Sequence, residues 1–72
     1  MKILHVVVSK GPDDFGVWIE ELAYVTSAGE TIEEAVSNLK EAISLYIEYN
    51  KDLPDWLVKG DYKLVVGDTL YE

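Results

Sequence analysis

The clearest alternation of apolar and polar positions lies between residues 31 and 49. Apolar side chains recur there at the spacing of one helix face. They are Ile32, Ala35, Val36, Leu39, Ala42, Ile43, Tyr46 and Ile47. Thr31 is a good N-cap, and Glu34 completes a capping box in which each side chain satisfies a backbone donor of the first turn. The pattern therefore predicts one long amphipathic helix that begins after Thr31.

The other apolar segments are short and rich in β-branched residues, which is typical of strands. They are residues 2–9, 17–22, 23–28 and 62–66. No glycine or proline separates the second segment from the third, so we expect a bend or bulge near residues 21–23 rather than a tight hairpin. After the helix, Pro54 prevents helical continuation, and the apolar residues that follow it predict an anchored loop or a short helical turn.

This order of elements predicts an α+β fold. Three strands form an antiparallel meander, the long helix packs on one face of the sheet, and a fourth strand follows the helix. One helix leaves the second face of the sheet without cover, so in a chain of 72 residues that face must be polar or covered by a partner. We place Trp18 and Tyr24 on that face. We therefore expect a homodimer or larger homo-oligomer, built from a single domain of residues 1–72.

Charge narrows the choice of partner. Fourteen carboxylates stand against six lysines and no arginine, which gives a net charge of −8. Nucleic acid repels such a chain, because its binding depends on phosphate neutralisation by cationic side chains. A basic protein attracts it, although the same charge can serve solubility alone. No apolar stretch approaches the roughly 20 residues of a membrane span, so we expect a cytoplasmic protein.

Candidate chemistry is sparse. Adjacent carboxylates could bind a hard cation or perform acid–base catalysis. They are Asp13/Asp14, Glu20/Glu21 and Glu33/Glu34. Aspartates in turns and glutamates in a first helical turn are ordinary, however. His5 is the only histidine and lies in an apolar strand, with no serine in a recognisable nucleophile setting. There is no cysteine. We expect no catalytic residue, no metal and no cofactor.

Two motifs carry a family resemblance. Phe15-Gly16 is an aromatic–glycine start, and Gly29-Glu30-Thr31-Ile32-Glu33-Glu34-Ala35 opens the helix. With them, residues 15–48 resemble the N-terminal domain of HicB-like antitoxins. The positions that match the structural motif are Gly16, Gly29, Thr31, Glu34, Ala35, Asn38 and Ala42. Where the family reads Pro-Asp-Leu-Pro-Gly-Cys, residues 20–25 read Glu-Glu-Leu-Ala-Tyr-Val.

The resemblance implies a partial RNase-H-like fold without the catalytic carboxylates of that superfamily. It implies a non-catalytic antitoxin that binds and neutralises a small basic HicA-like mRNA interferase toxin. It also implies a stand-alone version, because 72 residues leave no room for the family's DNA-binding domain. Glu20, Glu21 and Tyr24 are the candidate partner-binding residues, because they replace the family's signature segment. A metal-dependent nuclease on the same fold and a self-assembling domain with no toxin remain as alternatives.

Overall fold

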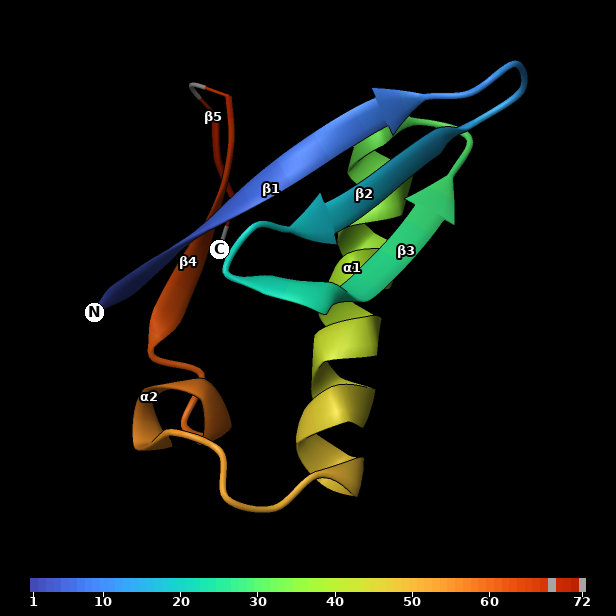
Figure 1. The fold of residues 1–72 in the computed structure, drawn as a ribbon. Helices are drawn as coiled ribbons and strands as arrows, with labels where there is room; N and C mark the ends of the chain where they lie inside the picture. The colour runs from blue at the N-terminus through green and yellow to red at the C-terminus, as the bar shows by residue number, and fades with distance from the viewer. Residues whose placement is uncertain (68, 72) are drawn as a thin grey trace.

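One five-stranded sheet organises the molecule. A computed structural model describes residues 1–67 and 69–71. The strands are β1 (Lys2–Lys10), β2 (Phe15–Ile19), β3 (Leu22–Gly29), β4 (Tyr62–Val66) and β5 (Thr69–Tyr71), and the helices are α1 (Ile32–Tyr49) and α2 (Asp55–Val58). The strand order is β3-β2-β1-β4-β5, with β1 antiparallel to β2 and parallel to β4. Figure 1 shows α1 behind β2 and β3, while the front of the sheet has no helix. The predicted α+β class is confirmed.

The start of α1 follows the predicted capping chemistry with one change. The Glu34 backbone N–H donates to Thr31 Oγ1 at 3.0 Å, as the capping box requires. The Glu34 carboxylate accepts instead from the backbone N–H of Glu30, one residue earlier than the box predicts, at 3.3 Å. Both bonds satisfy donors at the helix entrance and fix where α1 begins.

The core lies between α1 and the sheet. α1 contributes Ala35, Val36, Leu39 and Ile43, all of them buried. The strands contribute alternate residues, because side chains on a strand point to opposite faces in turn. These buried strand residues are Leu4, Val6, Val17, Ile19, Leu22, Val25 and Leu64. Leu57 of α2 closes the core beside the helix. The buried residues of β1 and β2 therefore stand at alternate positions and share one face of the sheet.

The turn between β2 and β3 differs from the prediction. Ile19 pairs directly with Leu22, so Glu20 and Glu21 form the tip of a tight hairpin that we did not expect. The irregularity that we did expect is present, since the register of the pair shifts between Trp18 and Ile19. The backbone N–H of Glu20 donates to the carbonyl of His5 at 2.8 Å. This bond to the neighbouring strand holds the hairpin without glycine or proline in the turn.

The C-terminal part of the chain adds one expected and one unexpected element. The short helical turn after Pro54 is α2, in which the Leu57 and Val58 backbone N–H groups donate to the Pro54 carbonyl. β5 was not predicted. It pairs antiparallel with β4 after Gly67, whose φ of 58° lies in the left-handed region that favours glycine.

Candidate functional site

The motif residues of the β3–α1 junction hold these elements together. A methyl group added to Gly29 would lie 2.5 Å from the backbone nitrogen of Ala35, so the strand approaches the helix too closely for a side chain. Asn38 Nδ2 donates to the carbonyl of Ala28 at 2.8 Å, which ties the middle of α1 to the same strand. Gly16 is different, because the nearest atom to an added methyl lies 3.8 Å away. These contacts give Gly29 and Asn38 roles in building the fold.

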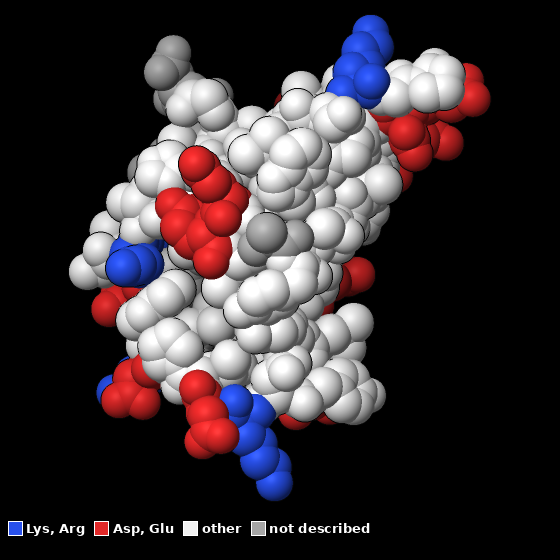
Figure 2. Space-filling view, in the orientation of Figure 1, with Lys and Arg blue, Asp and Glu red and all other residues white. Residues whose placement is uncertain are grey.

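The sheet face opposite α1 is a first candidate surface, here called the open face. It carries Ile3, His5 and Val7 of β1, Trp18 of β2 and Val65 of β4, since Val7 is paired with Trp18 and His5 with Val65. Val7, Trp18 and Val65 are half-buried but lie outside the core cluster. Figure 2 views this side and shows mostly uncharged atoms, with acidic atoms gathered in one cluster within it. The open face is therefore largely apolar, with one acidic feature and with Lys63 of β4 as the partner of Ile3.

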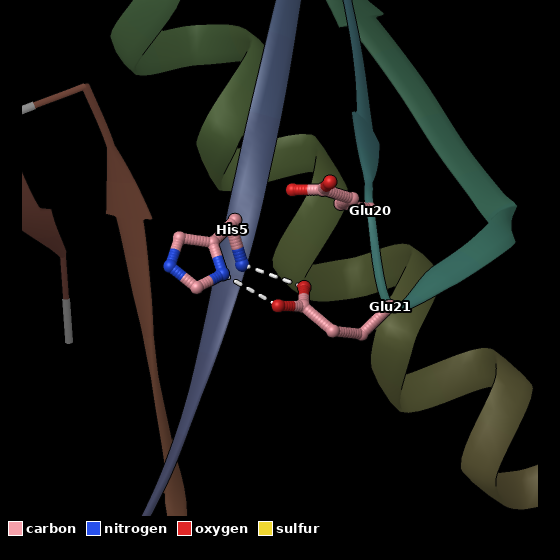
Figure 3. Close-up of side chains that lie close together, drawn as sticks. All are labelled: His5, Glu20 and Glu21. Atoms are coloured by element: carbon pink, nitrogen blue, oxygen red, sulfur yellow. Dashed lines mark hydrogen bonds and ion pairs between the residues drawn. The ribbon is translucent and has the colours of Figure 1, made fainter.

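That acidic feature is a cluster of His5, Glu20 and Glu21 (Figure 3). Glu21 reaches back from the hairpin tip to β1, where its carboxylate accepts from the His5 backbone N–H at 2.8 Å and meets His5 Nδ1 at 2.5 Å. The His5 side chain is 55% exposed and that of Glu21 is 32% exposed. The cluster fastens the β2–β3 hairpin to the central strand and leaves the Glu20 carboxylate in solvent.

The ion pair shifts the titration of both partners. Hydrogen bonding and charge attraction by Glu21, helped by the charge of Glu20, raise the pKa of His5 above its ordinary value of 6.5. Partial burial would raise the pKa of Glu21, but hydrogen bonds from the side chain and backbone of His5 outweigh it and hold the pKa below 4.5. Each shift favours the charged form, so the pair is ionised at mildly acidic pH.

A divalent metal ion is one ligand that this cluster could hold. One donor atom from each of the three residues lies within 4.8 Å of the others. Imidazole with carboxylates suits zinc and similar ions. However, Glu21 already uses both oxygens on His5, and His5 and Glu20 are exposed. An ion held through His5 Nδ1 would have to displace the Glu21 carboxylate from the ring, and the observed contacts are those of an ion pair that positions the hairpin.

A second candidate surface lies between β3 and the C-terminal half of α1, here called the tyrosine groove. It is a hollow of about 270 Å³ lined by Tyr24, Val25, Thr26, Ala42, Leu45, Tyr46 and Tyr49. The Tyr46 hydroxyl donates to the Tyr24 hydroxyl at 2.9 Å, and the two ring centroids are 5.0 Å apart. This bond and the loss of hydration raise the pKa of Tyr46 above 10.0. Tyr24 and Tyr49 are largely exposed, so the groove offers aromatic surface to a ligand.

The structure separates the predicted partner-binding residues. Glu20 and Glu21 lie at the hairpin tip with His5. The expectation that Tyr24 lies on the uncovered face is wrong, because its ring packs against Tyr46 of α1. The register shift between β2 and β3 changes which β3 side chains face the helix. Sequence reasoning missed the link between His5 and Glu21, because it needs the tight hairpin that the absence of turn residues argued against.

The comparisons with known proteins bear on identity. The family model described as "HicB_like antitoxin of bacterial toxin-antitoxin system" matches residues 4–59, which is well over half of the chain. The chain belongs to the HicB-like antitoxin family. The comparison with curated proteins and the comparison with solved structures each give no match. The match spans β1 to α2 and so includes the hairpin tip, the β3–α1 junction and the tyrosine groove of this HicB-like chain.

Neither helix in the described part of this HicB-like chain combines the length and the apolar character needed to cross a membrane. α1 is the longer of the two at 18 residues, and it carries two acidic residues in its first turn alone.

Proposed function

We propose that this chain is a non-catalytic binding domain that captures and neutralises a small basic HicA-like mRNA interferase toxin in the cytoplasm. Membership of the HicB-like antitoxin family is the observation that carries the proposal. It is supported by the capping-box entrance and β3–α1 junction, which give residues 1–67 the fold on which such a domain would work. Glu20, Glu21 and Tyr24 remain our candidate contacts.

Charge explains how such a domain can compete with RNA. A net charge of −8 attracts a basic protein over long range and speeds its association. Carboxylates on the antitoxin would then occupy the cationic surface that the toxin uses for phosphate groups. The chain has no arginine, which is the preferred side chain for phosphate and base contacts, so it is a poor RNA ligand itself.

Co-expression tests this proposal. The tagged chain is produced together with the small basic protein encoded beside its gene, and the purified material is assayed for RNA cleavage. We expect one complex, cleavage suppressed in it, and weaker binding as salt rises from about 0.05 M to about 0.5 M, because salt screens the attraction. If the tagged chain captures no such protein and cleavage continues at full rate, the chain is not an antitoxin for it.

A metal-dependent cleavage assay tests the alternative that the chain is a nuclease. The carboxylates nearest to a metal-binding arrangement are Glu20 and Glu21, beside His5. The purified chain is incubated with Mg²⁺ or Mn²⁺ and an RNA–DNA hybrid, with Glu20→Ala as the variant. We expect no cleavage by either protein. Metal-dependent cleavage that Glu20→Ala abolishes would instead make the chain an enzyme and overturn its description as a non-catalytic domain.

We also propose that the open face pairs with a second copy in a homodimer. Its three half-buried apolar residues pack on no core element, and pairing two such faces removes them from water. Two copies of charge −8 repel each other, so we expect the dimer to strengthen with salt while the toxin complex weakens. A dimer that captures no toxin would match the alternative of a self-assembling domain.

Light scattering across a range of concentrations measures the dimer. Trp18→Lys places a charge in the middle of the open face and should leave a monomer at every concentration. Tyr49→Lys makes a cationic substitution at an exposed helix position away from that face and should leave the dimer intact. A wild-type chain that stays monomeric at millimolar concentration and high salt would contradict the homodimer.

A further inference from the structure

Three features of the tyrosine groove favour a cation. The first is aromatic: Tyr24, Tyr46 and Tyr49 line one hollow, and Tyr24 and Tyr49 are 67% and 79% exposed. The face of an aromatic ring carries negative potential and attracts a cation placed over it. The hydrogen bond between the Tyr24 and Tyr46 hydroxyls fixes the relative position of two of these rings. The groove therefore presents a preformed aromatic wall.

The second feature is the acidic rim. Glu41 and Glu48 flank Leu45 on α1, because residues three or four apart are neighbours on a helix surface. Both glutamates are exposed, and Leu45 lines the groove. No lysine lines it. Neither glutamate is among the described residues that line the groove, so the two carboxylates supply negative potential beside it rather than direct contacts.

The third feature is the end of α1. Leu45, Tyr46 and Tyr49 belong to its last two turns, where the aligned backbone dipoles leave partial negative charge. The last turn of α1 contains no basic residue to offset this charge. Asn50 Nδ2 donates to the Tyr46 carbonyl at 2.8 Å, which covers one of the terminal carbonyl groups. The remaining dipole adds to the attraction of the rings and the carboxylates.

We propose that the tyrosine groove binds an arginine side chain of a basic partner protein, with the guanidinium stacked on the tyrosine rings and beside the helix surface that carries Glu41 and Glu48. The planar guanidinium stacks on aromatic rings and pairs with carboxylates better than the compact lysine ammonium does. A hollow of about 270 Å³ has room for one long side chain. The proposal rests on the proposed function, which supplies a basic partner.

The composition of the chain identifies the occupant as a different protein. The chain contains no arginine, so neither this copy nor a second copy can supply the guanidinium. A second copy would also bring a further charge of −8 to a negative surface. The groove therefore serves an arginine-bearing partner and not a second copy of the chain.

A peptide titration tests the groove directly. The full chain, labelled with ¹⁵N, is titrated with acetyl-Gly-Leu-Arg-Leu-Gly-amide, and backbone amide shifts are followed by NMR. Matched peptides carry lysine or citrulline, the uncharged analogue of arginine, at the central position. We expect shifts at residues 24–26 and 42–49, with affinity falling from arginine to lysine to citrulline. Shifts confined to the open face, or equal affinity for the citrulline peptide, would overturn the proposal.

Variants separate the groove from general charge. Tyr49→Ser should lower the affinity for the arginine peptide by about two- to fivefold, the amount expected for one exposed cation–π contact. Glu48→Gln should lower this affinity by about twofold, as for an exposed ion pair. Glu33→Gln removes the same charge at the other end of α1 and should leave the affinity unchanged. An equal loss with Glu33→Gln would mean that net charge alone holds the peptide.

The same variants distinguish the failure of this inference from the failure of the proposed function. If the wild-type chain captures the toxin and Tyr49→Ser and Glu48→Gln capture it equally well, the antitoxin role stands and the groove assignment is wrong. If the arginine peptide binds in the groove but no toxin is captured, the groove stands and the antitoxin role is wrong. Weaker capture by both groove variants, with Glu33→Gln unaffected, would support both.

Discussion

The two faces of the sheet carry similar apolar residues, but only one face is covered by the helix and buried. On β1, Leu4 and Val6 belong to the core and are at most 6% exposed, whereas Ile3 on the opposite face is 38% exposed. On β2, Val17 and Ile19 are buried, and Trp18 between them lies on the open face outside the core. Apolar character alone therefore does not decide which face is covered.

The two faces differ in the polar and small residues that lie among or beside their apolar side chains. The covered face has Gly29 at its edge, which lets α1 approach closely, and Asn38 bonded to β3. The open face has the His5–Glu21 pair and Glu20, and burying these charges under a helix without further partners would cost free energy. Gly29 and Asn38 thus let the helix pack on the covered face. The charged residues His5, Glu20 and Glu21 leave the other face available to another molecule.

The sharpest test of this comparison uses two neighbouring residues of β1. Leu4→Ala should lower the free energy of unfolding by about 2–5 kcal/mol, because Leu4 is fully buried and its truncation leaves a cavity. Ile3→Ala on the open face should cost about 1 kcal/mol or less, since its side chain is already partly in water. Urea denaturation of both variants gives the two values. Equal losses would mean that the open face is also covered in the isolated chain.

A pair of glycines gives the next largest effect. Gly29→Ala should destabilise the chain by about 1–3 kcal/mol, because the new methyl would lie 2.5 Å from the Ala35 backbone and force strand and helix apart. Gly16→Ala should change stability by less than about 1 kcal/mol, since the nearest atom to its methyl is 3.8 Å away. Thermal unfolding followed by circular dichroism compares them. A harmless Gly29→Ala would show that the junction can relax at little cost.

Sequence patterns predicted the covered face well. The helical stripe identified Ala35, Leu39 and Ile43, and the capping box placed the start of α1 at the right residue. These features depend on local spacing and on short-range hydrogen bonds, which the sequence carries directly. The segments rich in β-branched residues likewise identified the strands β1 and β4, because strand propensity is also a local property.

The candidate sites could not be predicted in the same way. Joining His5 to Glu21 requires the register of β1 against β2 and a hairpin tip at Glu20-Glu21, a turn without the glycine or asparagine that marks most tight hairpins. The tyrosine groove requires the shift in β3 that brings Tyr24 to Tyr46. Both depend on contacts between residues distant in sequence, which periodicity and local propensity do not encode.

The smallest expected effect concerns the ion pair on the open face. The raised pKa of His5 adds stability that is complete below pH 6.5 and is lost as the pH rises through the folded value. The lowered pKa of Glu21 adds stability above pH 4.5 that is lost as the pH falls. The stability difference between the wild-type chain and Glu21→Gln should therefore be largest from about pH 4.5 to about 6.5 and shrink above it. Urea denaturation across this range measures that difference.

NMR titration of the His5 ring shows whether the ion pair is the cause. The wild-type ring should titrate above 6.5, and Glu21→Gln should return its pKa towards that value. Glu20→Gln is the matched control, because Glu20 contributes the weakest of the charge effects on His5 and should change the titration only slightly. If the ring titrates at the same pH in all three proteins, Glu21 does not hold His5 in solution. The hairpin tip would then be attached to β1 through backbone groups of Glu20 and His5 rather than through the imidazole, and the charges of the open face would be free to rearrange around a partner.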